Sequence, residues 1–353
     1  MSKVFTGKNL MIVAGFVVGA LAALMTYLGN PANMGVCVAC FYRDIAGALG
    51  LHRAAIVQYL RPEIMGIALG AFLSALIFAE FRARGGSAPL VRFFLGAFFM
   101  IGALVFLGCP VRAVLRLAGG DLNAIAGLAG VVAGALLGIY FLKRGFNLGR
   151  WQAAYPAAGW LMPLLMLGLL LLVIGKPAFI FFSKEGPGAA HALLGVSLAA
   201  GLIIGFLAQR TRMCFVGGWR DLFLVKDTCL FSGIAAFFVG ALVVNAILGK
   251  INIGFTGQPV AHTNQLWNFL GMTLSGLTAT LLGGCPLRQT VLAGEGDTDA
   301  GVAILGMLAG AALAHNFQLA SSAQGTGPYG PAAVIIGLIF SAGVGFLMQE
   351  SAG

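Results

Sequence analysis

Long apolar runs alternate with short polar segments along almost the whole chain. Ten of these runs are about 18 to 23 residues long, enough for a helix to cross the ~30 Å hydrocarbon core of a bilayer. They cover residues 10–29, 62–80, 90–108, 122–142, 153–175, 189–208, 229–249, 265–283, 299–319 and 332–349. No segment between them is long enough to form a soluble domain. The pattern therefore predicts an all-α polytopic membrane protein with about ten hydrophobic spans.

The first run has some features of a signal peptide, because Lys3 and Lys8 precede an apolar stretch. The stretch is longer than the apolar part of a typical signal peptide. A counterpart also occurs in the middle of the chain. We therefore interpret this run as a retained membrane helix.

Two cysteine motifs recur half a chain apart. CPVR begins at Cys109 and CPLR at Cys285, 176 residues later, and each is followed at the same offset by Gly-Asp. CVACFYRD begins at Cys37 and CFVGGWRD at Cys214, 177 residues later. Two matches in nearly the same register indicate a duplication.

The duplication predicts a first repeat over residues 1–176 and a second over 177–353. Each repeat would hold five spans and two cysteine motifs. Because five is odd, the second repeat would cross the membrane in the opposite direction. Inverted repeats of this kind are typical of transporters.

The cysteine motifs interrupt the membrane helices. Pro110 and Pro286 directly follow their cysteines, and proline is well tolerated at the first position of a helix. Segments 37–50 and 214–227 are amphipathic and too short to span a bilayer. We therefore expect re-entrant short helices, which need a setting inside the protein or beside a water-filled cavity. The predicted shape is an hourglass-like pathway with thiols near its waist.

Composition and charge narrow the class of protein. The chain is 59% hydrophobic and 9% charged, whereas soluble domains carry about 25% charged residues. The net charge of +10 comes without a basic arm or aromatic-lined basic patch, so nucleic acid is not an expected partner. Lysines and arginines are more frequent in the loops on the side of the N-terminus, which predicts cytoplasmic N- and C-termini.

Eight charged residues accompany the motifs, and at membrane depth an unpaired charge costs roughly 2.5–3.5 kcal/mol. They are Arg43, Arg112, Arg220, Arg288, Asp44, Asp121, Asp221 and Asp297. Ion pairs that brace the re-entrant turns are one interpretation of these residues. Attraction of an anion is the other, and it suits Arg112 and Arg288, which lie three residues after a thiol.

The repeated cysteines are the candidate chemistry. Cysteine is a common small buried residue, and we apply that interpretation to Cys229. The repeat pairing instead indicates a substrate pathway of Cys37, Cys109, Cys214 and Cys285. Cys37 and Cys40 also form a C-x-x-C candidate dithiol for redox chemistry or soft metal binding, which has no counterpart in the second half.

Other chemistry is not indicated. The four histidines are scattered, and no catalytic triad, paired-carboxylate motif or nucleotide-binding loop is present. We therefore expect no enzyme active site, no cofactor and no metal.

The motifs resemble those of the YeeE/YedE family, and especially its selenium-metabolism YedE branch, over the whole chain. The resemblance implies a bacterial inner-membrane transporter of a sulfur-containing anion, thiosulfate in the better-understood members, passed between pathway cysteines. It also implies a small cytoplasmic SirA/TusA-like thiol carrier as a partner. The four-cysteine symmetry and the C-x-x-C pair favour a selenium species, with a thiosulfate-like ion next.

Two alternatives compete with transport. One is a membrane thiol enzyme or relay that hands sulfur or selenium to a soluble carrier protein, with covalent modification of Cys37 or Cys40. The other is an assembly or anchoring subunit without a pathway, in which all motif cysteines are replaceable.

Overall fold

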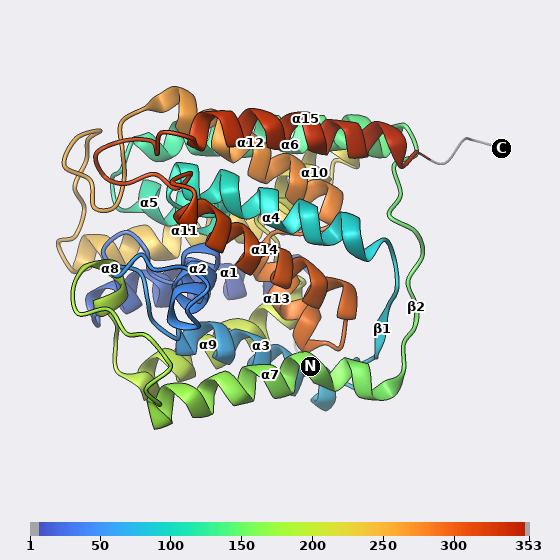
Figure 1. Ribbon diagram of the computed structural model, residues 1–353, viewed down its shortest axis with the longest axis horizontal. Helices are drawn as coiled ribbons and strands as arrows, with labels where there is room; N and C mark the ends of the chain where they lie inside the picture. The colour runs from blue at the N-terminus through green and yellow to red at the C-terminus, as the bar shows by residue number, and fades with distance from the viewer. Residues whose placement is uncertain (1–6, 350–353) are drawn as a thin grey trace.

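A helix forms at each of the ten predicted apolar runs in the computed structural model, which describes residues 7–349 (Figure 1). These helices are α1 (Lys8–Tyr27), α3 (Pro62–Ile77), α4 (Pro89–Phe106), α6 (Asn123–Lys143), α7 (Pro156–Gly175), α9 (Leu194–Thr211), α11 (Cys229–Ile247), α12 (Gln265–Leu282), α14 (Thr298–Asn316) and α15 (Gly330–Leu347). Within the described range, nine helical segments are long and apolar enough to cross a membrane, and α3 is a shorter apolar helix of 16 residues. The predicted all-α polytopic membrane fold is confirmed. Lys3 lies outside the described residues.

Short helices follow the cysteine motifs. They are α2 (Val38–Ala48), α5 (Pro110–Ala118), α10 (Gly217–Leu224) and α13 (Pro286–Gly294). As predicted, α5 and α13 begin at the prolines that follow their cysteines. The preceding helices end at equivalent residues in the left-handed region, Leu107 with φ 65° and Gly283 with φ 84°. This region suits glycine and strains leucine, so the first half holds the same reversal at a greater conformational cost.

Small elements that the apolar pattern does not indicate connect the long helices. Strand β1 (Arg84–Gly85) pairs antiparallel with β2 (Gln152–Ala153), and α8 (Gly186–Ala189) is a single turn. Figure 1 shows the two strands at one end of the helix bundle and α8 and α5 at the other. The strands tie the segment before α4 to the segment before α7.

Helices of one half pack mainly against helices of the other. α1 lies along α11, and α3 lies along α9; α4 lies along α14, and α6 lies along α12. Each contact thus has a counterpart in which the two halves exchange places, as a duplication would produce. The division of the chain into repeats at residue 176 stays a prediction.

Glycines bring these paired helices close together. A Cβ atom on Gly19 of α1 would lie 2.0 Å from the carbonyl oxygen of Phe237. A Cβ atom on Gly205 of α9 would likewise lie 2.0 Å from the carbonyl oxygen of Ile67. Both positions therefore require glycine, as is common where membrane helices touch backbone to backbone.

Candidate functional site

The first-half motifs bring two thiols together at the starts of two short helices. Cys37 is the N-cap residue of α2, and Cys109 is the N-cap residue of α5. The Cys37 thiol donates to the Cys109 Sγ over 3.6 Å, and the Cys37 Sγ accepts the backbone N–H of Cys40 at 3.4 Å. Both residues are fully buried. Two motifs 72 residues apart in sequence therefore form one thiol pair.

The second-half motifs form a matching pair. The Cys214 Sγ accepts the backbone N–H of Gly217 at 3.2 Å, the bond equivalent to that between Cys37 and Cys40. It also accepts the backbone N–H of Cys285, the N-cap residue of α13, at 3.3 Å. Cys214 and Cys285 are likewise buried. Each half of the chain thus supplies one buried thiol pair.

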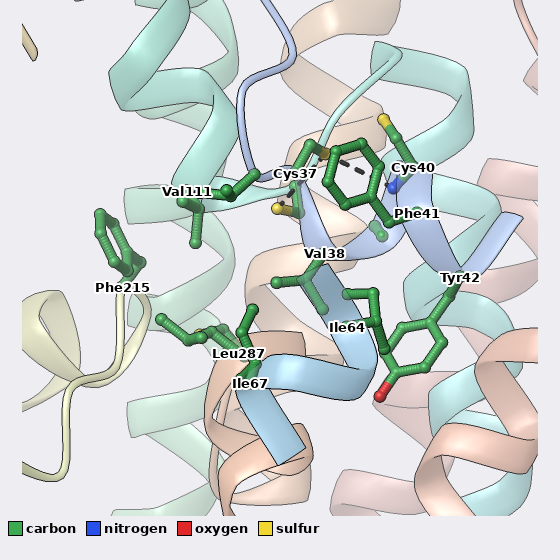
Figure 2. Packing of buried hydrophobic residues seen from close by; sticks show 14 of the residues in the cluster. Cys37, Val38, Cys40, Phe41, Tyr42, Ile64, Ile67, Val111, Phe215 and Leu287 are labelled. Carbon is green, nitrogen blue, oxygen red and sulfur yellow. Dashed lines mark hydrogen bonds between the residues drawn. The ribbon is translucent and has the colours of Figure 1, made fainter. Parts of the chain in front are cut away.

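An apolar side chain next to each motif cysteine is buried in the protein core. Val38 and Phe215 directly follow Cys37 and Cys214, and Val111 and Leu287 lie two residues after Cys109 and Cys285. All four side chains are at most 2% exposed and belong to one buried cluster. Figure 2 shows Val38 and Leu287 beside Ile64 and Ile67 of α3, with Val111 and Phe215 farther to one side. We call Val38, Val111, Phe215 and Leu287 the apolar septum.

The third thiol of the first half has a different environment. Cys40 is fully buried, and its Sγ accepts a hydrogen bond from Nη1 of Arg112 at 3.5 Å. Figure 2 shows the Cys40 sulfur pointing away from the septum. Cys229 lies half-buried at the start of α11, apart from the motif thiols. Cys37 of the predicted C-x-x-C pair therefore also contacts a thiol of another motif, that of Cys109.

Two of the Arg-Asp dipeptides form ion pairs within themselves. Arg43 bonds Asp44 at 2.6 Å and both are buried, while Arg220 bonds Asp221 at 2.7 Å in a partly exposed setting. Asp44 also binds the fully buried Arg61 at 2.7 Å, and Arg61 holds the carbonyls of Pro187 and Ala190 as well. Arg61 lies in no repeated motif, so the motif pattern does not indicate its part in this ion-pair group.

Arg112 is held by the backbone. Its guanidinium donates to the carbonyl oxygens of Asn33, Leu107 and Val260, and the side chain is fully buried. Asp121 instead pairs with Arg116 at 2.6 Å, and neither side chain is exposed. These contacts favour bracing over anion attraction for Arg112.

Arg288, the counterpart of Arg112, is partly exposed. It donates to Glu295 at 3.2 Å, and Asp297 pairs with Arg84 rather than with Arg288. Arg84 also bonds Glu295 at 3.0 Å. The two motif arginines thus occupy different surroundings: one is enclosed by backbone, and the other lines a cavity.

Two cavities are lined by residues from segments that flank the cysteine motifs. The first has a volume of about 230 Å³, and its lining includes five amide side chains and one lysine: Asn30, Asn33, Asn245, Lys250, Asn252 and Gln258. The second, of about 500 Å³, adjoins the second-half motifs and is lined by Glu80, Arg82, Arg84, Trp151, Arg212, Arg288 and Glu295. We call them the first mouth and the second mouth. The first includes residues of α5 and the second includes Arg84 of β1, and these elements lie at opposite ends of the bundle (Figure 1).

Glu80 of the second mouth remains ionised at neutral pH. The amide of Gln209 lowers the pKa of this carboxyl group, against the effect of its burial, and the guanidiniums of Arg210 and Arg212 lower it further. The second mouth therefore carries both signs of charge.

The histidines provide no metal site within the described residues. Two of the four come together, since the rings of His52 and His315 lie 4.5 Å apart. Residues 7–349 contain no group of three His, Cys, Asp or Glu side chains arranged to hold a metal ion.

Comparison with known proteins points to sulfur transport. Residues 210–344 match the family described as "Sulphur transport". A thiosulfate transporter TsuA of Spirochaeta thermophila is 33% identical over 113 residues, which are 32% of this chain and 34% of that protein. The TsuA of Escherichia coli K12 is 33% identical over 100 residues, 28% of each chain. The aligned part thus spans about a third of these relatives.

The matched region begins at the end of α9 and contains Cys214, Cys285 and the short helices that follow them. It therefore includes one complete thiol pair and half of the apolar septum. This region of the chain is therefore similar to the sulphur transport family, in keeping with the family resemblance of its cysteine motifs.

Proposed function

We propose that this protein carries a sulfur- or selenium-containing anion across the bacterial inner membrane along its four motif cysteines. The observation that carries the proposal is the gathering of these cysteines into two buried pairs within one apolar cluster that also holds the septum residues. Residues that flank the motifs of each pair line one mouth. The similarity to two thiosulfate transporters supports the same function.

Weak thiol contacts suit rapid transfer. A thiol is a weak hydrogen-bond donor, so an anion bound by S–H groups is easily released to the next pair. A covalent persulfide would instead have to be broken at every step. We propose that the anion leaves water in one mouth, exchanges contacts with one thiol pair, passes the septum and reaches the other pair.

The septum would keep the pathway closed between passages. An apolar constriction expels water and so opposes the passage of ions. In the observed structure all four motif cysteines are at most 4% exposed, which corresponds to an occluded state.

A selenium species is our favoured substrate, and a thiosulfate-like ion is next. Soft, polarisable atoms suit thiol ligands better than hard oxyanions do. The additional thiol of Cys40 gives the first half three thiols, in keeping with the selenium branch. The two similar proteins described above are named as thiosulfate transporters.

We further propose that the termini and the second mouth face the cytoplasm and that the two halves are inverted repeats. A small SirA/TusA-like thiol carrier would accept the product on the cytoplasmic side. The arginines of the second mouth support this orientation, since basic residues concentrate on the cytoplasmic side. Membrane lipid surrounds the bundle, whose long helices expose many large apolar side chains.

Uptake by liposomes tests the function. Purified protein is reconstituted, and uptake of thiosulfate, sulfate, selenite and selenosulfate is compared for wild type, Cys285→Ala and Cys229→Ala. We expect uptake of one soft species, reduced at least about tenfold by Cys285→Ala because a pathway thiol is lost. The matched control Cys229→Ala should retain wild-type uptake, since this thiol lies apart from the pairs.

Two results would contradict the proposal. If Cys285→Ala transports as well as wild type, the thiols are not the pathway. If no species is taken up even with the carrier protein present, and intact mass shows a sulfur or selenium adduct on Cys37 or Cys40, the protein is instead a membrane thiol enzyme.

A further inference from the structure

The two mouths occupy equivalent places in the two halves. The backbone N–H of Arg82 donates to the carbonyl of Glu295 at 3.0 Å, and that of Asn252 donates to the carbonyl of Gly119 at 2.9 Å. Glu295 and Gly119 lie at the same offset from their motif cysteines. Asn252 therefore holds at the first mouth the position that Arg82 holds at the second.

A second pair of bonds extends the equivalence. The N–H of Arg84 donates to the carbonyl of Gly296 at 3.2 Å, and the N–H of Gly254 donates to the carbonyl of Gly120 at 3.1 Å. Arg84 thus corresponds to Gly254. The same backbone arrangement carries arginines at the second mouth and uncharged residues at the first.

A third arginine of the second mouth also has an uncharged counterpart. Arg212 lies two residues before Cys214, where the first half has Gly35 two residues before Cys37. The second mouth is lined by four arginines and two glutamates, and the first by a single charged residue, Lys250. The cluster of arginines is therefore a feature of the second mouth alone.

Two of its four guanidiniums have no ion-pair partner in the described part of the chain. Arg84 and Arg288 are held by Glu295, and Arg84 also by Asp297. Arg82 and Arg212 are exposed, and neither guanidinium forms a hydrogen bond or an ion pair with residues 7–349. The carboxylates of the cavity thus form their ion pairs with other arginines. Arg212 lies close enough to Glu80 to lower the pKa of that carboxyl group, but within the described residues the guanidiniums of Arg82 and Arg212 both keep their donor groups free.

We propose that the second mouth is an anion-binding site, separate from the thiols, in which Arg82 and Arg212 bind a small doubly charged oxyanion of the sulfate or thiosulfate type. Guanidinium groups present several donors in a planar fork that matches such oxygens. The cavity of about 500 Å³ admits an ion that keeps part of its water shell. A role in holding the transported anion rests on the proposed function, whereas the binding itself does not.

Trp151 offers a direct measurement, because it lines the same cavity and is 60% exposed. Protein in phosphatidylcholine nanodiscs is titrated with sodium thiosulfate and with sodium sulfate at ionic strength held constant with sodium chloride. We expect a saturable change in tryptophan fluorescence that disappears in Trp151→Phe. Arg82→Asn and Arg212→Gly, which introduce the residues found at the equivalent positions of the other half, should each weaken binding at least about tenfold, the scale of one charge-assisted hydrogen bond.

Controls separate this site from the pathway. Lys226→Asn removes an exposed positive charge outside the lining of the mouth and should leave the dissociation constant unchanged. Cys214→Ala and Cys285→Ala should also bind the anion normally, so that loss of transport and loss of this site are distinguishable. The proposal is overturned if the response is not saturable, if both arginine variants bind like wild type, or if Trp151 responds only to phosphatidylglycerol added to the bilayer.

Discussion

At the scale of single residues, each cysteine motif contributes one paired thiol and one apolar septum residue. The motif cysteines are paired, and the residues that follow them form the septum. Phe215 is the largest septum member, and its ring also contacts Phe237 edge to face at 4.9 Å. Its size suggests that it contributes most to closing the path.

Phe215→Ala is expected to open a leak. The removed ring leaves space that water can enter, and hydration of an apolar constriction lowers the barrier for ions. Chloride flux from liposomes should rise several-fold over wild type. Phe99→Ala, which removes an equally buried ring from α4 outside the septum, serves as the control. Equal flux in wild type and Phe215→Ala would show that the septum does not close the pathway.

At the scale of elements, the fold depends on close approach of helices from opposite halves. The backbones of α9 and α3 meet at Gly205, whereas Gly195 of the same α9 has no neighbouring atom within 4 Å of its added Cβ. A larger residue therefore has no space at Gly205 but has space at Gly195, although both positions lie in the same helix.

Gly205→Ala should destabilise the protein, and Gly195→Ala should not. The added methyl group must push α9 away from α3, and overpacking of this kind costs about 1–3 kcal/mol. Thermal unfolding of the purified variants in detergent measures the difference. A midpoint for Gly205→Ala equal to that of Gly195→Ala would mean that the two helices separate freely.

At the scale of the whole molecule, the paired contacts between halves and the two mouths at opposite ends fit a transport protein with one access on each side. The mouths share backbone architecture and differ in charge. We propose that this difference in charge gives the two sides of the molecule unequal affinity for an anion.

The proposed orientation is testable by labelling. In a Cys229→Ala background, Thr256→Cys lies in the exposed loop near the first mouth and Arg150→Cys lies in the exposed loop near the second. A membrane-impermeant maleimide added to spheroplasts should label Thr256→Cys, and Arg150→Cys only after the membrane is permeabilised. The reverse pattern would place the N-terminus outside.

The sequence determined the ten helices, the places where they break and the identity of the motif cysteines. Long apolar runs leave the backbone little choice but a helix in lipid, and proline after cysteine marks a helix start through its own geometry. These are local effects, so they can be read from neighbouring residues. The ion pairs Arg43–Asp44 and Arg220–Asp221, which were one of two interpretations open from the sequence, also join partners that are adjacent in the chain.

Only the tertiary structure decided which groups meet over long distances in the chain. Arg116 rather than Arg112 pairs with Asp121, Arg61 joins Asp44, and Cys37 contacts Cys109. The charge difference between the mouths is also visible only in the tertiary structure. Arg82 and Asn252 share no sequence motif, and their equivalence is seen from the matching backbone hydrogen bonds that they form. Such contacts depend on how the helices pack, and packing is set by side-chain shapes throughout the bundle rather than by any local pattern.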